Sequence, residues 1–213
     1  VAQDKAIARM VVGSAVMGYL TNLQMNGKAT GAYPQDPKER DSWKLQGFGE
    51  AKISPNIGVF TTFFPDHLNY YAENMDAYLA DKANIFLYQK PEDTLVLGSQ
   101  CAPTIIEKYG EKIESKTIVV DELKLPDTWT LCIPGMHNRY NAALALAAAR
   151  ALGTPDEVSR RALESFSGVP GRLELIREVN GIKIYNDTTA TTPEATNAAI
   201  TALSDVGRGT SYI

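Results

Sequence analysis

The chain has 213 residues, 44% of them hydrophobic, which is enough to bury a proper core in one large or two small domains. Its net charge of −4 comes without an evident basic face, which argues against a nucleic-acid partner. The two cysteines form neither a metal-spaced set nor a disulfide framework, as in a reducing cytoplasm, and neither a membrane-spanning apolar run nor a signal peptide is expected.

Residues 5–25 carry apolar side chains at helical spacing over much of their surface. This pattern predicts a core helix buried against a sheet. The Gly27-Lys28 pair that follows invites a phosphate-loop interpretation. We reject it because such a loop joins a strand to a helix, whereas this pair follows a predicted helix and precedes a predicted loop at residues 33–37.

The most informative stretch runs from residue 57 to residue 67. Strand-forming residues fill it up to Phe63, and Pro65 ends the strand because it has no N–H to donate. Asp66 and His67 therefore follow a strand end, the edge of an open α/β sheet where ligands bind. Imidazole is a good metal ligand that an adjacent carboxylate can orient. The alternative is a hydrogen-bonded histidine in an ordinary turn.

A helix capped by Asn74 is predicted next, with apolar residues recurring up to Phe86. Lys82 lies within this region beside Asp81, and a solvated lysine is the simplest interpretation of it. Strands are then predicted at residues 94–97, 116–120 and 130–133, with a helix at residues 102–109. This alternation predicts a parallel sheet covered by helices.

An alanine-rich helix is predicted from Met136 to Leu152. Asn138 and Asn141 lie one turn apart near its start and project from one face. Two amides together can read the edge of a purine. The alternative is that they form a helix cap and a helix–loop hydrogen bond.

A Gly/Pro-rich joint at residues 167–171 marks the predicted domain boundary. Residues 172–185 then read as a β-hairpin with an Asn-Gly turn. A helix begins at Pro193 with Thr192 as its cap, and it runs to about residue 203.

Several strings of this sequence resemble the Mur ligase family. They are Thr-Phe-Phe-Pro-Asp-His-Leu at residues 62–68 with the helix at 78–86, Pro-Gly-Met-His-Asn-Arg-Tyr-Asn-Ala at 134–142, and the runs at 169–174 and 186–195. The likeness is greatest to the branch that adds D-glutamate to UDP-N-acetylmuramoyl-L-alanine, because other branches carry Asp-His type motifs at the last run. It implies an α/β fold with a parallel central sheet flanked by helices. Residues 1–168 would form a central ATPase-like domain, incomplete at its amino terminus, and residues 169–213 would begin a Rossmann-like carboxy-terminal ligase domain.

The resemblance also implies roles for single residues. His67 matches a histidine that binds magnesium, and Lys82 matches a lysine that is carbamylated and supports the same ion, both at the catalytic centre. A neutral lysine that takes up carbon dioxide becomes an anion, which suits a hard cation. The remaining matches are Asn138 and Asn141 with the ATP base, Arg172 with an ATP phosphate, Asp187 with the nucleotide ribose and Thr191 with the D-glutamate site.

The run at residues 39–46 is similar to a family strand, Glu-Leu-Ser-Ser-aromatic-x-Leu, whose glutamate ligates magnesium. Glu39, Ser42 and Trp43 match this pattern, whereas Arg40 and Asp41 do not. Two interpretations of Glu39 therefore stay open, a metal ligand and a member of a solvated charge run.

Parts of the family pattern are not found in this chain. Gln24, Met25 and Ala29 stand where the family's phosphate loop has a glycine, a threonine and a hydroxyl residue. The resemblance begins at about Ser42, so the UDP-binding amino-terminal domain is not seen. The carboxy-terminal domain is expected to continue beyond Ile213. We therefore expect this chain alone to be inactive.

The activity implied by the resemblance is ATP- and Mg²⁺-dependent amide-bond formation in peptidoglycan precursor synthesis, through an acyl phosphate. We expect a cytoplasmic monomer acting on UDP-N-acetylmuramoyl-L-alanine and D-glutamate, with no nucleic-acid or membrane partner. A folylpolyglutamate-synthase-like ligase would keep the metal site and change the substrate. A non-catalytic remnant would explain the missing phosphate loop.

ATP and adenosine are expected to bind this chain with similar, weak affinity, because a triphosphate without a phosphate loop has lost its main partner. Base, ribose and one phosphate would still be contacted by the two asparagines, Arg172 and Asp187. These residues lie on the two predicted domains, and bringing the domains together around a ligand costs ordering entropy. Calorimetry with magnesium measures both affinities. Low-micromolar binding of ATP without any binding of adenosine would show a working phosphate cradle and contradict our interpretation of residues 1–40.

Overall fold

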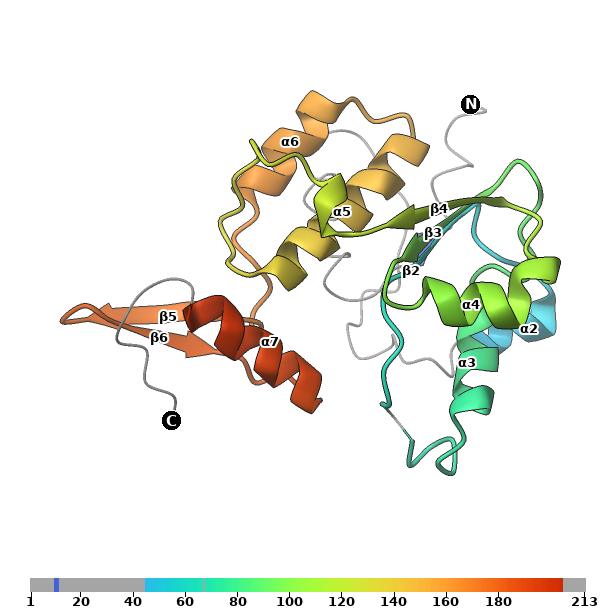
Figure 1. The fold of residues 1–213 in the computed structure, drawn as a ribbon, viewed down its shortest axis with the longest axis horizontal. Helices are drawn as coiled ribbons and strands as arrows, with labels where there is room; N and C mark the ends of the chain where they lie inside the picture. Colours follow the sequence, from blue (N-terminus) through green and yellow to red (C-terminus); the bar gives the residue numbers. More distant parts are fainter. Residues whose placement is uncertain (1–9, 12–44, 67, 205–213) are drawn as a thin grey trace.

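The computed structural model describes residues 10–11, 45–66 and 68–204 of the protein. Within these parts the chain forms a four-stranded parallel sheet in the order β1-β2-β3-β4 (Figure 1). The strands are β1 (Met10–Val11), β2 (Ile57–Phe60), β3 (Thr94–Gly98) and β4 (Lys116–Val120). The predicted α/β fold with a parallel sheet is confirmed.

Helices cover both faces of the sheet (Figure 1). On one face lie α3 (Met75–Ala83) and α4 (Ala102–Tyr109), and on the other lies α5 (Met136–Ala151) with α6 (Asp156–Ser165) against it. The shorter helices are α2 (Gln46–Ala51), η3 (Gly110–Lys112) and η4 (Glu122–Lys124). None of the described helices has both the length and the apolar character needed to cross a membrane.

The register of the strands divides their side chains between these two faces. Val59 pairs with Val96, and Phe60 pairs with Leu97. The two valines belong to the apolar cluster under α5, whereas Phe60 and Leu97 belong to the cluster under α3 and α4. All four side chains are buried, as expected for a parallel sheet covered on both faces.

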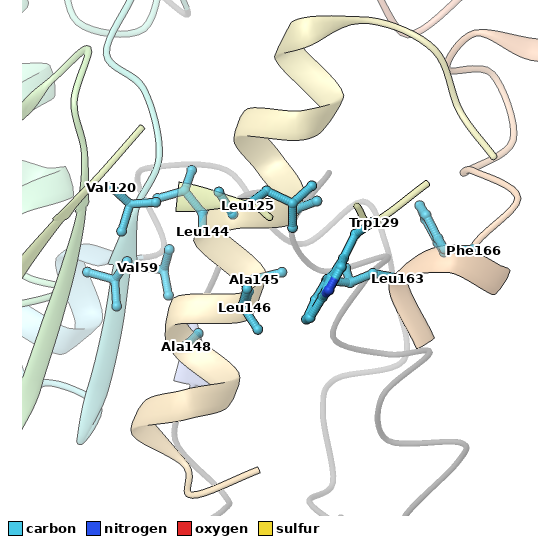
Figure 2. Packing of buried hydrophobic residues seen from close by; sticks show 13 residues of the cluster. Val59, Val120, Leu125, Trp129, Leu144, Ala145, Leu146, Ala148, Leu163 and Phe166 are labelled. Atoms are coloured by element: carbon cyan, nitrogen blue, oxygen red, sulfur yellow. The ribbon is translucent and has the colours of Figure 1, made fainter. Parts of the chain in front are cut away.

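The alanine-rich helix α5 packs closely on the sheet (Figure 2). Ala145 and Ala148 have no exposed surface, and their short side chains let the helix approach the strands. Leu144 and Leu146 fill the space beside them and are equally buried. The alanine run thus serves packing as well as helix propensity.

Local signals placed several elements correctly. The Asn74 side chain accepts hydrogen bonds from the N–H groups of Asp76 and Ala77, both at 3.0 Å, so it caps α3 as predicted. That helix ends at Ala83, and the apolar residues up to Phe86 continue in turns. The first turn of α4 contains proline as predicted. The predicted helix ends at Tyr109, whereas in the structure the chain continues directly into the 3-10 helix η3.

Two predicted elements differ from the structure. Met10–Val11 is a strand, whereas residues 5–25 were expected to be helical, and the rest of that range lies outside the described residues. Short apolar runs suit a buried strand as well as a helix, so periodicity alone does not separate them.

The strand expected at residues 130–133 is also wrong, because this segment bonds to the end of α6 and joins no ladder in the described sheet. The Thr130 N–H donates to Glu164 Oε1 at 3.2 Å, and the Cys132 thiol donates to the Glu164 carbonyl at 2.9 Å. Strand propensity reports a residue's suitability for a sheet and not the presence of a neighbouring strand.

The carboxy-terminal elements are an antiparallel hairpin and a helix (Figure 1). They are β5 (Glu174–Val179), β6 (Ile182–Asn186) and α7 (Pro193–Ser204). The turn residues Asn180 and Gly181 both have positive φ, 50° and 80°, as the predicted Asn-Gly turn requires. Thr192 Oγ1 accepts from the Ala195 N–H at 3.2 Å and caps α7. The domain boundary at residues 168–169 stays a prediction.

Gly98→Ala should lower the free energy of unfolding by about 1–3 kcal/mol, as overpacking does. An added Cβ at this last residue of β3 would overlap the Tyr140 hydroxyl and the Thr61 carbonyl oxygen. Urea unfolding measures the loss. Gly47→Ala is the matched control, because nothing lies within 4 Å of a Cβ built there and the residue is helical. Equal stability of the two variants would contradict this account of Gly98.

Candidate functional site

Lys82 lies near the carboxyl ends of β2 and β3, where α3 brings it against aromatic side chains. Its Nζ is 5.0 Å from the centre of the Tyr78 ring and 5.9 Å from that of Phe60. Burial lowers the pKa of Lys82, while the charge of Asp66 acts in the opposite direction. The lysine is thus partly withdrawn from water and within electrostatic reach of Asp66, which differs from the solvated lysine of the simplest interpretation.

Phe63 extends the aromatic surroundings of Lys82. Its ring centre lies 5.3 Å from that of Tyr78 and 6.5 Å from that of Phe60. These separations are typical of interacting aromatic pairs. Phe63 belongs to residues 61–66, which we call the β2 exit segment, so the segment that leads to Asp66 also contacts the rings beside Lys82.

The β2 exit segment is bonded to neighbouring elements. The Tyr140 hydroxyl of α5 donates to the Thr61 carbonyl at 2.8 Å, and burial raises the pKa of Tyr140 to about 12. The carboxamide of Gln100, just after β3, bonds to the backbone of Phe63. Sequence reasoning missed both residues, and the only available signal was that Gln100 is polar and lies just beyond the end of a strand.

Cys101, just before α4, contacts the carboxyl ends of β2 and β3. Its buried thiol lies 3.3, 3.5 and 3.6 Å from the carbonyl oxygens of Gly98, Phe60 and Thr61. Burial raises the pKa of Cys101 to about 11. The thiol is therefore protonated at neutral pH and donates to these carbonyls.

The other expected metal ligands cannot be placed beside Lys82. His67 and Glu39 lie outside the described residues. Within the described part of the chain, no three His, Cys, Asp or Glu side chains gather in a way that would hold a metal. Among the described side chains near Lys82, Asp66 is an oxygen donor of the type that Mg²⁺ takes, because proteins hold this ion through one or two carboxylates together with substrate phosphates and water. The metal site itself stays a prediction.

The first turn of α5 carries the predicted base-binding asparagines. Asn138 is buried, and its Nδ2 donates to the Pro134 carbonyl at 2.7 Å. This helix–loop bond is the structural alternative considered for Asn138. Asn141 is partly buried one turn further along.

The same turn of α5 meets the carboxy-terminal elements. A Cβ built on Gly135 would lie 2.6 Å from Ala202 Cβ of α7. Burial lowers the pKa of His137, and the charge of Asp187 acts in the opposite direction. Asp187 is thus within electrostatic reach of the residue before Asn138, and the roles of both residues in binding base and ribose stay predictions.

Asp187, Arg172 and Thr191 lie around the start of the hairpin and of α7. Asp187 Oδ1 accepts from the Leu173 N–H at 3.0 Å, which ties β6 to the residue after Arg172. Arg172 is partly buried, and its own N–H donates to the Val169 carbonyl at 3.0 Å. Thr191 is exposed just before α7. The binding roles of these residues stay predictions.

Comparison with known proteins identifies this arrangement. Residues 44–129 match the family model of the Mur ligase middle domain. The chain is 34% identical over 196 residues to the UDP-N-acetylmuramoylalanine–D-glutamate ligase of Roseiflexus sp. (strain RS-1), a match that covers 78% of this chain and 42% of that protein. The chain belongs to the Mur ligase family.

Two further Mur ligase relatives are similar over most of this chain. The protein of the same name from Aquifex aeolicus (strain VF5) is 35% identical over 169 residues, which is 76% of this chain and 40% of that protein. The UDP-N-acetylmuramoyl-L-alanine–L-glutamate ligase of Xanthomonas axonopodis pv. citri is 29% identical over 78% of this chain and 39% of that protein. The chain spans about two fifths of the length of these relatives.

Solved structures agree with the Mur ligase fold. MurF from Acinetobacter baumannii superimposes with a TM-score of 0.65 at 18% identity, over 92% of this chain and 52% of that one. FolC from E. coli, solved with DHPP and ADP, gives 0.58 at 19% identity, over 74% and 40%. At these identities the likeness concerns the fold alone, and both proteins share it.

Asn138→Ala should lower the free energy of unfolding by about 1–3 kcal/mol, because it leaves the Pro134 carbonyl without its partner. Asn141→Ala on the same helix is the control and should change stability little while weakening adenosine binding. Urea unfolding and calorimetry measure the two effects. Similar stability losses in both variants would contradict the structural role given to Asn138.

Proposed function

We propose that this Mur ligase chain belongs to an ATP-dependent ligase that joins D-glutamate to UDP-N-acetylmuramoyl-L-alanine. The observation that carries the proposal is the similarity, over 78% and 76% of the chain, to proteins named UDP-N-acetylmuramoylalanine–D-glutamate ligase. Because the chain spans only part of their length, the activity is proposed for the complete protein. The substrates, UDP-linked alanine and ATP, place the proposed reaction in the cytoplasm as a step of peptidoglycan precursor synthesis.

The surroundings of Lys82 support this proposal. Burial lowers the pKa of its amine, which makes the neutral form more available than in a free lysine. The neutral nitrogen attacks the carbon of carbon dioxide, so an N–C bond forms and one C–O π bond opens to take the negative charge. The nitrogen loses a proton to solvent. The resulting carbamate offers oxygen donors near Asp66.

A magnesium ion fits these donors. Lys82, as its carbamate, would hold the ion together with substrate phosphates, and the family resemblance adds His67 and Glu39. When bound, the ion supplies neutralisation of the charge that builds between the phosphate and the carboxylate. The neighbouring aromatic rings limit water around Lys82, which strengthens such electrostatic effects.

The amide bond would form in two balanced steps. The alanine carboxylate takes the terminal phosphoryl group of ATP, and ADP leaves. The glutamate nitrogen then attacks the acyl carbon, the C–N bond forms, the C–O bond to phosphate breaks and a proton is lost from nitrogen. We assign the asparagines and Asp187 to the base and ribose, Arg172 to a phosphate, and Thr191 to the glutamate.

Two alternatives remain as outcomes of one experiment. A folylpolyglutamate-synthase-like ligase is compatible with the fold shared with FolC, and a non-catalytic remnant is compatible with the missing phosphate loop. Phosphate release from ATP is measured in the complete protein with UDP-N-acetylmuramoyl-L-alanine and either D- or L-glutamate, and with a folate and L-glutamate. Release only with the muramoyl substrate and D-glutamate supports our proposal, and its absence there overturns it.

Lys82→Ala is expected to lower turnover of the complete enzyme by about a hundredfold, the scale of losing a preorganised charge from an active site. An added short-chain carboxylate should restore part of the activity, because it replaces the carbamate's oxygen donors. Steady-state phosphate release measures both. Near-normal turnover of Lys82→Ala without additives would remove this residue from the catalytic centre.

His67→Ala is expected to raise the magnesium concentration that gives half-maximal activity, by about tenfold, as for the loss of an ion contact. The KM for D-glutamate should rise less, because the substitution acts on the ion. Magnesium and glutamate titrations of the same variant separate the two effects. An unchanged magnesium titration would exclude His67 as a ligand.

A further inference from the structure

Gln100 bonds to both polar backbone groups of a single residue in the β2 exit segment. Its Oε1 accepts from the Phe63 N–H at 2.8 Å, and its Nε2 donates to the Phe63 carbonyl at 3.1 Å. We call this pair of bonds the Gln100–Phe63 clamp. It continues the pairing of β2 with β3 beyond the last paired residues, Phe60 and Leu97, with a side chain in place of a strand.

The clamp fixes a residue whose ring lies next to those around Lys82. Phe63 contacts the rings of Tyr78 and Phe60 at 5.3 and 6.5 Å. The Lys82 amine lies over those two rings. A chain of direct contacts therefore runs from Gln100 through Phe63 to the surroundings of the Lys82 amine.

We propose that Gln100 is a positioning residue that holds the β2 exit segment closed beside Lys82. The proposal deepens the proposed function, on which its catalytic meaning rests. Gln100 itself does not reach Lys82 in the described contacts, so it acts through the backbone of Phe63. The Tyr140 bond to the Thr61 carbonyl secures the beginning of the same segment from α5.

A purely structural role explains Gln100 less well. Its side chain is exposed and belongs to neither of the two apolar clusters of the sheet. The strands it follows are already held by their ladder from Ile57 to Phe60. The segment that gains from the clamp is the one beyond the ladder, which leads to Asp66.

The test measures how well Lys82 is shielded in this chain at one fixed pH. An N-hydroxysuccinimide acetate reagent acetylates lysines, and mass spectrometry gives the rate at Lys82 relative to the exposed Lys90. Gln100→Met keeps the side-chain length and removes both bonds. Losing two ordinary hydrogen bonds changes an opening equilibrium by about tenfold, so we expect the Lys82/Lys90 ratio to rise by about that factor. The midpoint of thermal unfolding should fall by only about 2–5 °C, as the loss of the same two bonds from the native state requires.

Gln46→Met is the matched control. Gln46 Nε2 donates to Asp81 Oδ2 at 2.7 Å, so this variant also removes a side-chain hydrogen bond of a glutamine close to Lys82 but leaves the clamp intact. Its Lys82/Lys90 ratio should match that of the unmodified chain. A ratio for Gln100→Met within about twofold of the unmodified chain, or an equal rise in Gln46→Met, would overturn the proposal.

A second readout uses the complete enzyme. Gln100→Met should lower kcat by about tenfold and leave the KM for ATP within about twofold, because the clamp bonds to the backbone of Phe63 and not to the side chains assigned to the base and ribose. Unchanged kcat would overturn the catalytic meaning of the clamp. Failure of the proposed function is recognised separately in a ¹³C-bicarbonate experiment. In that case the carbamate signals of the unmodified chain and of Lys82→Ala would be the same. The acetylation ratio still decides the clamp in that case.

Discussion

The absence of a side chain at Gly98 is the constraint on which the site depends. At this last residue of β3, a Cβ would occupy the place where the Tyr140 hydroxyl meets the Thr61 carbonyl. Because the place is free, α5 can bond to the end of β2 across β3 at 2.8 Å. One bond thereby links the helix that carries the asparagine motif to the segment that leads to Asp66. The residue before the same helix, Gly135, packs against Ala202 of α7.

The two edges of the sheet differ in how their polar groups are used. At the amino edge, Gln89 is buried, and its side-chain amide holds neighbouring segments together through hydrogen bonds. Its Nε2 donates to the carbonyls of Pro55 and Thr94 at 2.9 and 3.0 Å, and its Oε1 accepts from Ser115 at 2.7 Å. Such a satisfied network makes an edge rigid. At the carboxyl edge, where ligands bind to α/β sheets, Lys82 lies over aromatic rings and within electrostatic reach of Asp66.

Sequence reasoning succeeded where structure is set by local chemistry. Asn74 as a cap, the Asn180-Gly181 turn and the alternation of strands with helices were all predicted, because each depends on residues close together in the chain. Residues 130–133 failed for the opposite reason, since their bonds to Glu164 cannot be inferred from strand-forming residues alone. Lys82 was recognised through its motif, whereas its burial became visible only in the fold.

The anchors of the β2 exit segment were beyond sequence reasoning for the same physical reason. Gln100 bonds to a residue 37 positions away, and Tyr140 bonds to one 79 positions away. No periodicity marks such pairs, because they arise only when neighbouring strands end at the same edge.

Long-range anchors of this kind also suit a site that must hold opposite charges together. Lys82 loses hydration as a cation, and as a carbamate it would need a cation of its own, so either form depends on the nearby segment staying closed. The bonds that keep that segment in place are therefore part of the electrostatics of the site, although they carry no charge themselves.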